Sequence, residues 1–200
     1  MGRSGKLIVI TGPMFSGKTT RLLKEVRKAS KNKKAVLFRS AMDKRYSATE
    51  VVSHDGMRLP AMTLESGQGC ISTLKEVAND YDVIAIDEGQ FWQETGGFAD
   101  ALDDLAYGSK RVYVAMLNKD ANGNPFRISK DLLPLADTIY CLESKCSKCK
   151  GKANFSQRIM NGIEVHGDDF VVGGSDVYEP RCRKHFVRPG NSRAQIQKPQ

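Results

Sequence analysis

The residues best suited to chemistry lie near the N-terminus, in one glycine-containing stretch. It fits G-x-x-x-x-G-K-[ST], the phosphate-binding P-loop, without a mismatch and comprises Gly12, Pro13, Met14, Phe15, Ser16, Gly17, Lys18 and Thr19. An apolar run at 6–10 precedes it and a helical pattern begins at Thr20, so backbone N–H groups and a helix N-terminus can surround a phosphate. In such a site the Lys18 ammonium faces the β- and γ-phosphates and the Thr19 hydroxyl ligates Mg²⁺. The alternative is a chance match in a glycine turn.

An acidic pair, Asp87-Glu88, follows the apolar run at 82–86. An acid at the end of a buried strand in a P-loop protein is the Walker B position, which predicts that Asp87 holds Mg²⁺ through water. Glu88 comes next and points elsewhere, which makes it the candidate base for the nucleophile that attacks the γ-phosphorus. Phosphoryl transfer needs little more than alignment, charge neutralisation and a proton acceptor. The alternative is a solvent-facing acidic pair without a catalytic role.

Several of the five cysteines have the spacing of metal ligands. Cys146 and Cys149 form C-x₂-C, and Cys182 and His185 form C-x₂-H; together they complete a tetrahedral Zn²⁺ shell. Since disulfides are rare in cytosolic proteins, this grouping predicts a structural zinc site that stabilises an element too small to fold alone. The alternative is a set of unconnected thiol and imidazole side chains.

The other cysteines and histidines lack such spacing. Cys141 lies in an apolar run and is expected in the core, whereas Cys70 has no assignment. His54 and His166 have no partner at ligand spacing, so neither is predicted to bind a metal.

The elements that must position these groups alternate between strand and helix. Apolar runs predict buried strands at 6–10, 35–38, 82–87, 111–117 and 138–142. Helical patterns occur at 20–26, 71–79 and 97–107, with a short turn or helix at 132–136. This alternation predicts a parallel sheet flanked by helices, which binds ligands at the carboxyl ends of its strands. The predicted fold class is therefore α/β, with a P-loop NTPase-like sheet.

The character of the chain changes along its length. Residues 41–60 are polar and mixed, which predicts a long loop. From residue 145 the elements become short, and Asn161-Gly162 predicts a hairpin between 155–160 and 163–166. We divide the chain into a P-loop α/β nucleotide-binding domain at 1–143, a small zinc-binding domain at 144–190 and a polar, disordered tail at 191–200.

Composition narrows the partners. The chain has 200 residues, of which 40% are apolar and 27% charged, as in ordinary soluble globular proteins. It has no apolar run long enough to cross a membrane and no signal-peptide core, so we expect a cytoplasmic protein without a membrane partner. The net charge of +8 would suit nucleic acid or a site for polyanionic nucleotides. Because the basic clusters lack interleaved aromatic residues, we expect no nucleic-acid partner.

In this order, the P-loop, the Asp-Glu-x-Gln-Phe segment at 87–91 and the paired zinc ligands resemble the type II thymidine kinase family. The resemblance runs from about residue 6 to 187. Residues 43–47 resemble the family's Asp-x-Arg-Tyr motif in a flexible loop, and 173–178 resemble the lasso segment that closes over the nucleoside.

The resemblance implies transfer of the γ-phosphoryl group of ATP to the 5′-hydroxyl of thymidine or deoxyuridine, in pyrimidine salvage. Glu88 is then the base, and the ATP site extends beyond the P-loop to Asp43, Arg45, Asp87 and Gln90, with Mg²⁺ held by Thr19 and Asp87. The resemblance also implies a homotetramer or homodimer and feedback inhibition by thymidine triphosphate.

For the nucleoside, the resemblance implies a pyrimidine edge held by lasso backbone and a base walled by apolar and aromatic side chains. The lasso residues are Asp169, Phe170, Val171, Val172 and Gly173. The walls are Met14, Phe91, Leu117, Ala121, Phe126 and Tyr178. The stretch 116–126 departs from the family's Leu-Asp-Gly-x-[FY] run before Pro-Phe, and Ala121 stands where an aromatic residue is common, which weakens the prediction of base selectivity.

Two other functions stay open. One is a P-loop kinase of another small alcohol or nucleotide, which a comparison of thymidine with deoxycytidine would separate. The other is a zinc-containing, nucleic-acid-binding ATPase, which DNA-stimulated ATPase activity would reveal. The absence of a recognition-helix pattern between the zinc ligands and of helicase-like motifs speaks against the second.

Overall fold

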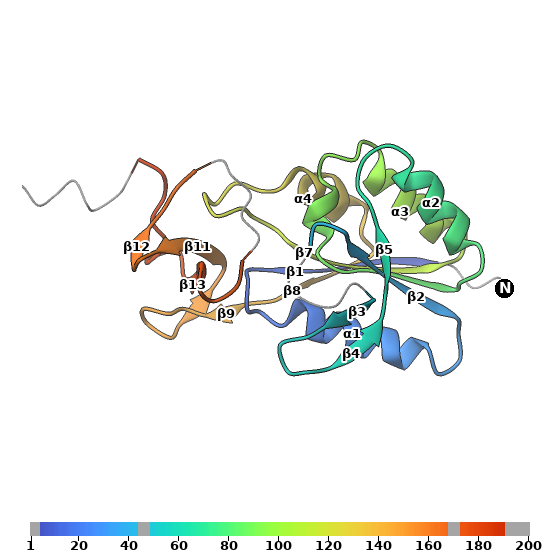
Figure 1. Cartoon of the computed structure of the whole chain (residues 1–200), viewed down its shortest axis with the longest axis horizontal. Coiled ribbons are helices and arrows are strands. Elements are labelled where there is room, and N and C mark those ends of the chain that lie inside the picture. The colour runs from blue at the N-terminus through green and yellow to red at the C-terminus, as the bar shows by residue number, and fades with distance from the viewer. Residues whose placement is uncertain (1–4, 44–48, 168–172, 191–200) are drawn as a thin grey trace, which may run out of the picture.

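The computed structural model describes residues 5–43, 49–167 and 173–190. Its centre is a six-stranded sheet in the order β5-β2-β6-β7-β1-β8, with each neighbouring pair parallel (Figure 1). The strands are β1 (Lys6–Gly12), β2 (Ala35–Ser40), β5 (Met62–Leu64), β6 (Val83–Ile86), β7 (Arg111–Leu117) and β8 (Thr138–Cys141). The predicted α/β class and parallel sheet are confirmed.

Helices cover both faces of this sheet (Figure 1). On one face lies α1 (Lys18–Ala29), together with the hairpin of β3 (Glu50–Val52) and β4 (Arg58–Pro60). The other face carries α2 (Cys70–Ala78), α3 (Phe98–Tyr107) and α4 (Arg127–Leu132), followed by the 3₁₀ turn η2 (Leu133–Leu135). Because side chains alternate along a strand, Leu7 and Val9 of β1 pack in the core under α2–α4, whereas Ile8 and Ile10 pack under α1.

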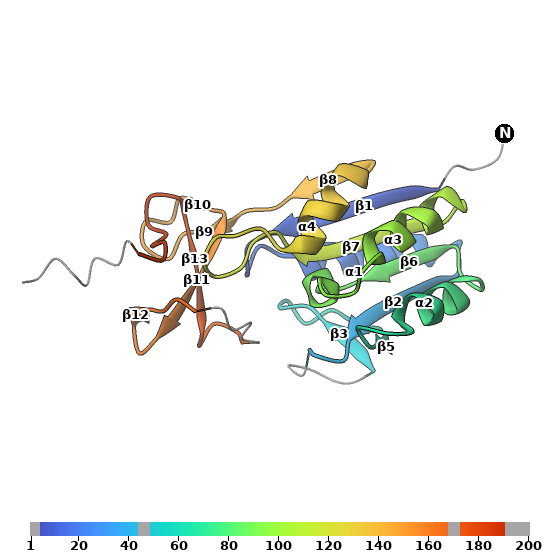
Figure 2. The ribbon, with the colours of Figure 1, turned by 90° about the horizontal axis from the view of Figure 1, so that it is seen from above.

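A small second lobe lies beyond the carboxyl ends of the central strands, which point toward it in Figure 2. It contains an antiparallel pair and a three-stranded sheet in the order β12-β11-β13. Its strands are β9 (Ser144–Lys145), β10 (Lys152–Ala153), β11 (Phe155–Met160), β12 (Ile163–Glu164) and β13 (Tyr178–Arg181). The predicted hairpin is confirmed, since Asn161 and Gly162 join β11 to β12 with φ angles of 52° and 78°.

The structure differs from the sequence prediction in several places. The predicted loop at 41–60 contains the β3–β4 hairpin, and β5 adds a sixth strand after it. Neither β5 nor α4 was predicted, because such short elements leave little periodic pattern. Cys141 is exposed, so its predicted place in the core is wrong: β8 is an edge strand, and burial alternates along it.

Among the described residues, no helix combines the length and apolar character that a membrane span requires. The predicted disordered tail at 191–200 lies outside the described residues, and the division into domains stays a prediction.

Candidate functional site

The P-loop connects the end of β1 to the start of α1. Gly17, with φ at 82°, caps the helix, and Gly12 lies so close to β8 that an added Cβ would be 2.4 Å from the Leu142 carbonyl oxygen. The Lys18 ammonium is buried and donates a hydrogen bond of 2.7 Å to the Pro13 carbonyl, which holds it inside the loop. Ser16 donates to the same carbonyl at 2.8 Å. The loop therefore has a compact backbone path that ends in a helix N-terminus.

The acidic pair lies beside the P-loop at the carboxyl ends of the parallel strands. Asp87 continues β6 and is 6% exposed, and the Thr19 hydroxyl lies 3.2 and 3.3 Å from its two carboxylate oxygens. A hydroxyl and a carboxylate at this separation are the oxygen ligands that Mg²⁺ prefers. Thr19 and Asp87 could therefore hold one metal ion together.

Glu88 begins the 3₁₀ turn η1 (Gly89–Trp92) with left-handed backbone angles, φ 53° and ψ 46°. Trp92, which is fully buried, stacks on Phe98 of α3 at 5.3 Å and fixes the far end of this turn. The Gln90 side chain is 3% exposed and contacts both Glu88 and the end of β7. The chain therefore leaves the strand direction at Glu88, and the buried Trp92 and Gln90 hold the turn that follows in place.

A single cavity of about 590 Å³ joins these groups to the small lobe. Residues predicted for ATP and catalysis that line it are Met14, Phe15, Gly17, Lys18, Thr19, Asp43, Asp87, Glu88 and Gln90. Residues predicted for the nucleoside that line it are Met14, Phe91, Leu117, Ala121, Phe126, Gly173 and Tyr178. Gly12, Pro13 and Ser16 shape the P-loop without lining this cavity. Arg45, Asp169, Phe170, Val171 and Val172 lie outside the described residues.

Among the described residues, two hydrogen bonds join the small lobe to the P-loop. The Met14 amide donates to the Ser156 hydroxyl of β11 at 2.9 Å, and the Ser144 hydroxyl donates to the Phe15 carbonyl at 3.1 Å. The connection from β7 to α4 also contacts this lobe, because the side-chain amide of Asn122 donates a hydrogen bond of 3.0 Å to the Gly167 carbonyl. The cavity therefore has walls from both lobes.

The cavity is also lined by residues that were not predicted from the sequence, among them Arg39, His54 and Ser156. Arg39, at the end of β2, is buried and its guanidinium donates to the Asp43 carbonyl. The sequence could have predicted Arg39 as a cavity residue, because it follows an apolar strand at the edge of the sheet that carries Asp87. His54 and Ser156 also line the cavity, but only the β3–β4 hairpin and the docking of the small lobe bring them there.

Burial shapes the electrostatics of the cavity wall. Burial raises the pKa of Tyr178, which keeps its phenol neutral. Burial and the Arg183 charge together lower the pKa of Lys119. The Lys119 ammonium lies 4.6 Å and the Arg183 guanidinium 5.1 Å from the centre of the Phe155 ring. Both cations therefore make a cation–π interaction with this ring.

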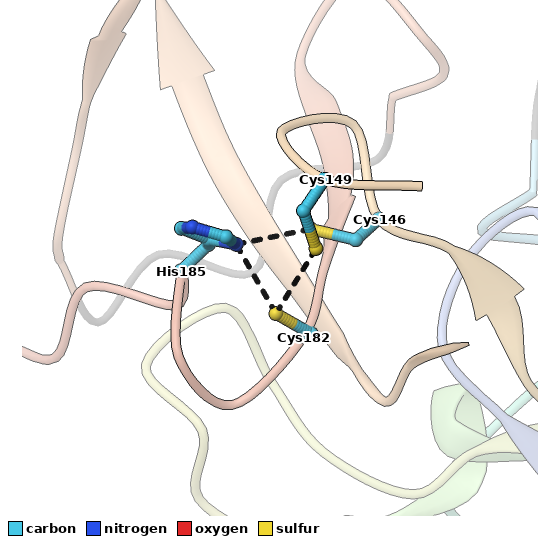
Figure 3. A group of neighbouring side chains, drawn as sticks. All are labelled: Cys146, Cys149, Cys182 and His185. Carbon is cyan, nitrogen blue, oxygen red and sulfur yellow. Dashed lines mark hydrogen bonds between the residues drawn. The ribbon is translucent and has the colours of Figure 1, made fainter. Parts of the chain in front are cut away.

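The predicted metal ligands come together in the small lobe (Figure 3). The ligand atoms of Cys146, Cys149, Cys182 and His185 all lie within 4.8 Å of one another. Cys149 Sγ is 3.8 Å from Cys182 Sγ, and His185 Nδ1 is 3.7 Å from Cys146 Sγ and 3.2 Å from Cys182 Sγ. Tetrahedral Zn²⁺ with ordinary bond lengths spaces two sulfur ligands about 3.8 Å apart and a sulfur and a nitrogen about 3.6 Å apart. The cluster could therefore hold zinc.

The thiol chemistry agrees with this geometry. Burial opposes ionisation of Cys146, but hydrogen bonds from the backbone of Cys182, Cys149 and Lys148 outweigh it and lower its pKa to about 6. A thiolate is the form that binds a metal. Two short turns present the ligands, and each returns a backbone hydrogen bond to its first cysteine: Lys150 to Cys146 at 2.8 Å and His185 to Cys182 at 3.0 Å.

A P-loop on a parallel sheet, an acidic pair beside it and a Cys₃His lobe that closes the cavity are typical of a P-loop phosphotransferase with a metal-binding lobe. Comparison with known proteins narrows this class. A sequence model of the family described as thymidine kinase matches residues 5–186.

Individual relatives agree with the family match. The chain is 41% identical to a thymidine kinase of Thermococcus kodakarensis, with 94% of this chain and 98% of the relative covered. It is 39% identical to one of Coprothermobacter proteolyticus (95% and 94% covered) and 37% identical to one of Pyrobaculum aerophilum (92% and 99% covered). The chain belongs to the thymidine kinase family, and the family predicted from its motifs is confirmed.

Proposed function

We propose that this protein transfers the γ-phosphoryl group of ATP to the 5′-hydroxyl of thymidine or deoxyuridine, giving the 5′-monophosphate. The observation that carries the proposal is the single cavity, which is lined both by the P-loop with its acidic pair and by the apolar and aromatic walls expected for a pyrimidine nucleoside. Family membership over 5–186 supports the same substrates.

In this mechanism the chain supplies alignment, charge and a proton acceptor. The P-loop amides and the N-terminus of α1 bind the phosphates, and the Lys18 ammonium leaves the Pro13 carbonyl to face them. Thr19 and Asp87 would hold Mg²⁺, which neutralises charge on the β- and γ-phosphates when bound. The 5′-oxygen of the nucleoside attacks the γ-phosphorus and ADP leaves, while Glu88 accepts the proton of the 5′-hydroxyl.

We assign the nucleoside to the part of the cavity that both lobes build. Phe91, Phe126 and Tyr178 supply aromatic surface, and Leu117 and Met14 complete an apolar wall. Ala121 contributes only a methyl group, so the pocket has more room at this point than an aromatic side chain would leave. Backbone groups of 169–173 would read the pyrimidine edge.

We further propose that Cys146, Cys149, Cys182 and His185 bind a structural Zn²⁺. All four ligand positions are then filled by protein, so the ion stabilises the small lobe and takes no part in the reaction. A cytoplasmic location, assembly as a homotetramer or homodimer, inhibition by thymidine triphosphate, and contacts of Asp43 and Arg45 with ATP are proposals of the same kind, drawn from the sequence and its family resemblance.

The test is ADP formation from ATP and Mg²⁺ with a panel of deoxynucleosides, with and without DNA. Turnover that depends on thymidine and deoxyuridine, with little from deoxycytidine or purines, is the expected result. Turnover without nucleoside preference, or only with DNA, would refute the substrate and keep the phosphate chemistry. Glu88→Gln should lower kcat by about 10²–10⁴ with ATP binding preserved, and activity within a few-fold of wild type would remove Glu88 as the base.

A further inference from the structure

Gln90 is a buried polar side chain whose amide is held at both ends. It is 3% exposed, and its Nε2 lies 2.5 Å from Oε2 of Glu88, while its Oε1 lies 2.9 Å from the backbone nitrogen of Leu117. A buried amide with both ends bonded has one orientation, because releasing either hydrogen bond would leave a polar group without a partner.

The chemistry of the two partners fixes which end of the amide faces which. The Leu117 backbone N–H can only donate, so it requires the Gln90 carbonyl oxygen. The Glu88 carboxylate can only accept when ionised, so it requires the Gln90 NH₂ group. Glutamine is the residue that satisfies both at once: glutamate cannot donate when ionised, and asparagine is shorter by a methylene.

The anchor for this amide is itself rigid. Leu117 is the last residue of β7, and its carbonyl accepts a hydrogen bond of 3.0 Å from the Ser129 hydroxyl of α4. The turn that carries Gln90 is pressed against the same strand, because a Cβ on Gly89 would lie 2.8 Å from Val114 Cγ1 and 3.2 Å from Met116 Cβ. The amide therefore ties the Glu88 carboxylate to the central sheet.

We infer that Gln90 is a positioning residue that holds the Glu88 carboxylate in place for proton abstraction, an inference that rests on the proposed role of Glu88 as the base. A glutamate side chain has three rotatable bonds, and a base must lie within hydrogen-bond reach of its proton. The donated hydrogen bond removes this freedom and also favours the ionised form, which is the form that accepts a proton. The sequence predicts Gln90 as a contact of ATP, and the two hydrogen bonds of its amide add a role at Glu88.

The decisive variant is Gln90→Glu, which keeps the size of the side chain and an acceptor for the Leu117 amide but replaces the donor to Glu88 by a carboxylate. We expect thymidine-dependent kcat to fall by about 10- to 100-fold, with KM for ATP and thymidine within a few-fold of wild type. The added carboxylate disfavours the ionised form of Glu88, so the acidic limb of the kcat–pH profile should move to higher pH. Other charged residues of the cavity, among them Lys18, Arg39 and Asp87, are the same in the variant and in the wild type. Gln90→Met, which loses both hydrogen bonds, should also lower kcat and provides a second test if the first variant folds poorly.

Controls separate positioning from loss of structure. Gln68→Met makes the same chemical change at an exposed position outside this cavity and should leave turnover unchanged. In a Glu88→Gln background, Gln90→Met should cost less than threefold, because a residue that acts through Glu88 has nothing left to position. Wild-type kcat and pH profile in both Gln90 variants, or an equal loss with and without Glu88, would overturn the inference. Absence of thymidine-dependent turnover in the wild type would instead refute the proposed function.

Discussion

Gly123 offers a direct test of how the nucleoside pocket is joined to the small lobe. It lies in the connection from β7 to α4 with φ at 85°, and an added Cβ would meet the Phe186 ring at 2.9 Å. That ring stacks on Phe155 of β11 with centroids 4.4 Å apart, so it cannot move without disturbing the lobe. Gly123→Ala therefore imposes both a strained backbone and a steric clash.

The two costs can be separated with Gly162, whose φ is 78° and whose added Cβ would meet nothing within 4 Å. Gly162→Ala should cost only the left-handed backbone, about 1 kcal/mol. Gly123→Ala should cost the same plus overpacking of about 1–3 kcal/mol. For a protein of 200 residues, that excess lowers Tm by about 2–12 °C relative to Gly162→Ala, measured by differential scanning calorimetry at one scan rate.

The same substitution should weaken nucleoside binding. The Asp120 carboxylate accepts hydrogen bonds from the backbone amides of Asn122 and Asn124 at 2.9 and 2.8 Å, so the turn around Gly123 moves as a unit. Ala121 and Asn122 line the cavity, and a displaced turn should raise KM for thymidine about tenfold with KM for ATP unchanged. Equal Tm values for the two alanine variants, together with a wild-type KM for thymidine, would refute this reasoning.

Three further predictions concern the phosphate loop and the metal ligands. Lys18→Ala should lower kcat by about 10²–10³ through lost charge stabilisation; an unchanged rate in the nucleoside assay would remove the P-loop assignment. Elemental analysis should find zinc in the wild type and none in Cys149→Ser, and a wild-type protein without zinc would contradict the proposed zinc site. Cys146 would bind zinc as a thiolate, and its pKa in the metal-free protein is about 6, so protons compete with zinc for this ligand and zinc retention after dialysis should fall as the pH is lowered below about 6. Retention that does not change between about pH 7 and pH 4 would contradict the assigned ligands.

Signals that depend on neighbouring residues in the chain were readable from the sequence. The P-loop, the acid after a buried strand and the Asn161-Gly162 turn are local, because each follows from the backbone conformation of a few consecutive residues. The apolar runs predicted five of the six central strands for the same reason, and the edge of the sheet that carries Lys18 and Asp87 followed from them. The Cys₃His cluster was also predicted, because each pair of its residues lies on one short turn.

Features that depend on packing between distant segments needed the tertiary structure. Cys141 has an apolar sequence context but lies on an edge strand, and Arg39 and Ser156 reach the cavity only because β2 and the small lobe are placed against the P-loop. The role of Gln90 depends on the Leu117 amide, 27 residues away. A local pattern records which conformation a segment prefers, whereas hydrogen-bond partners and burial are set by which surfaces meet, and that information exists only once the chain has folded.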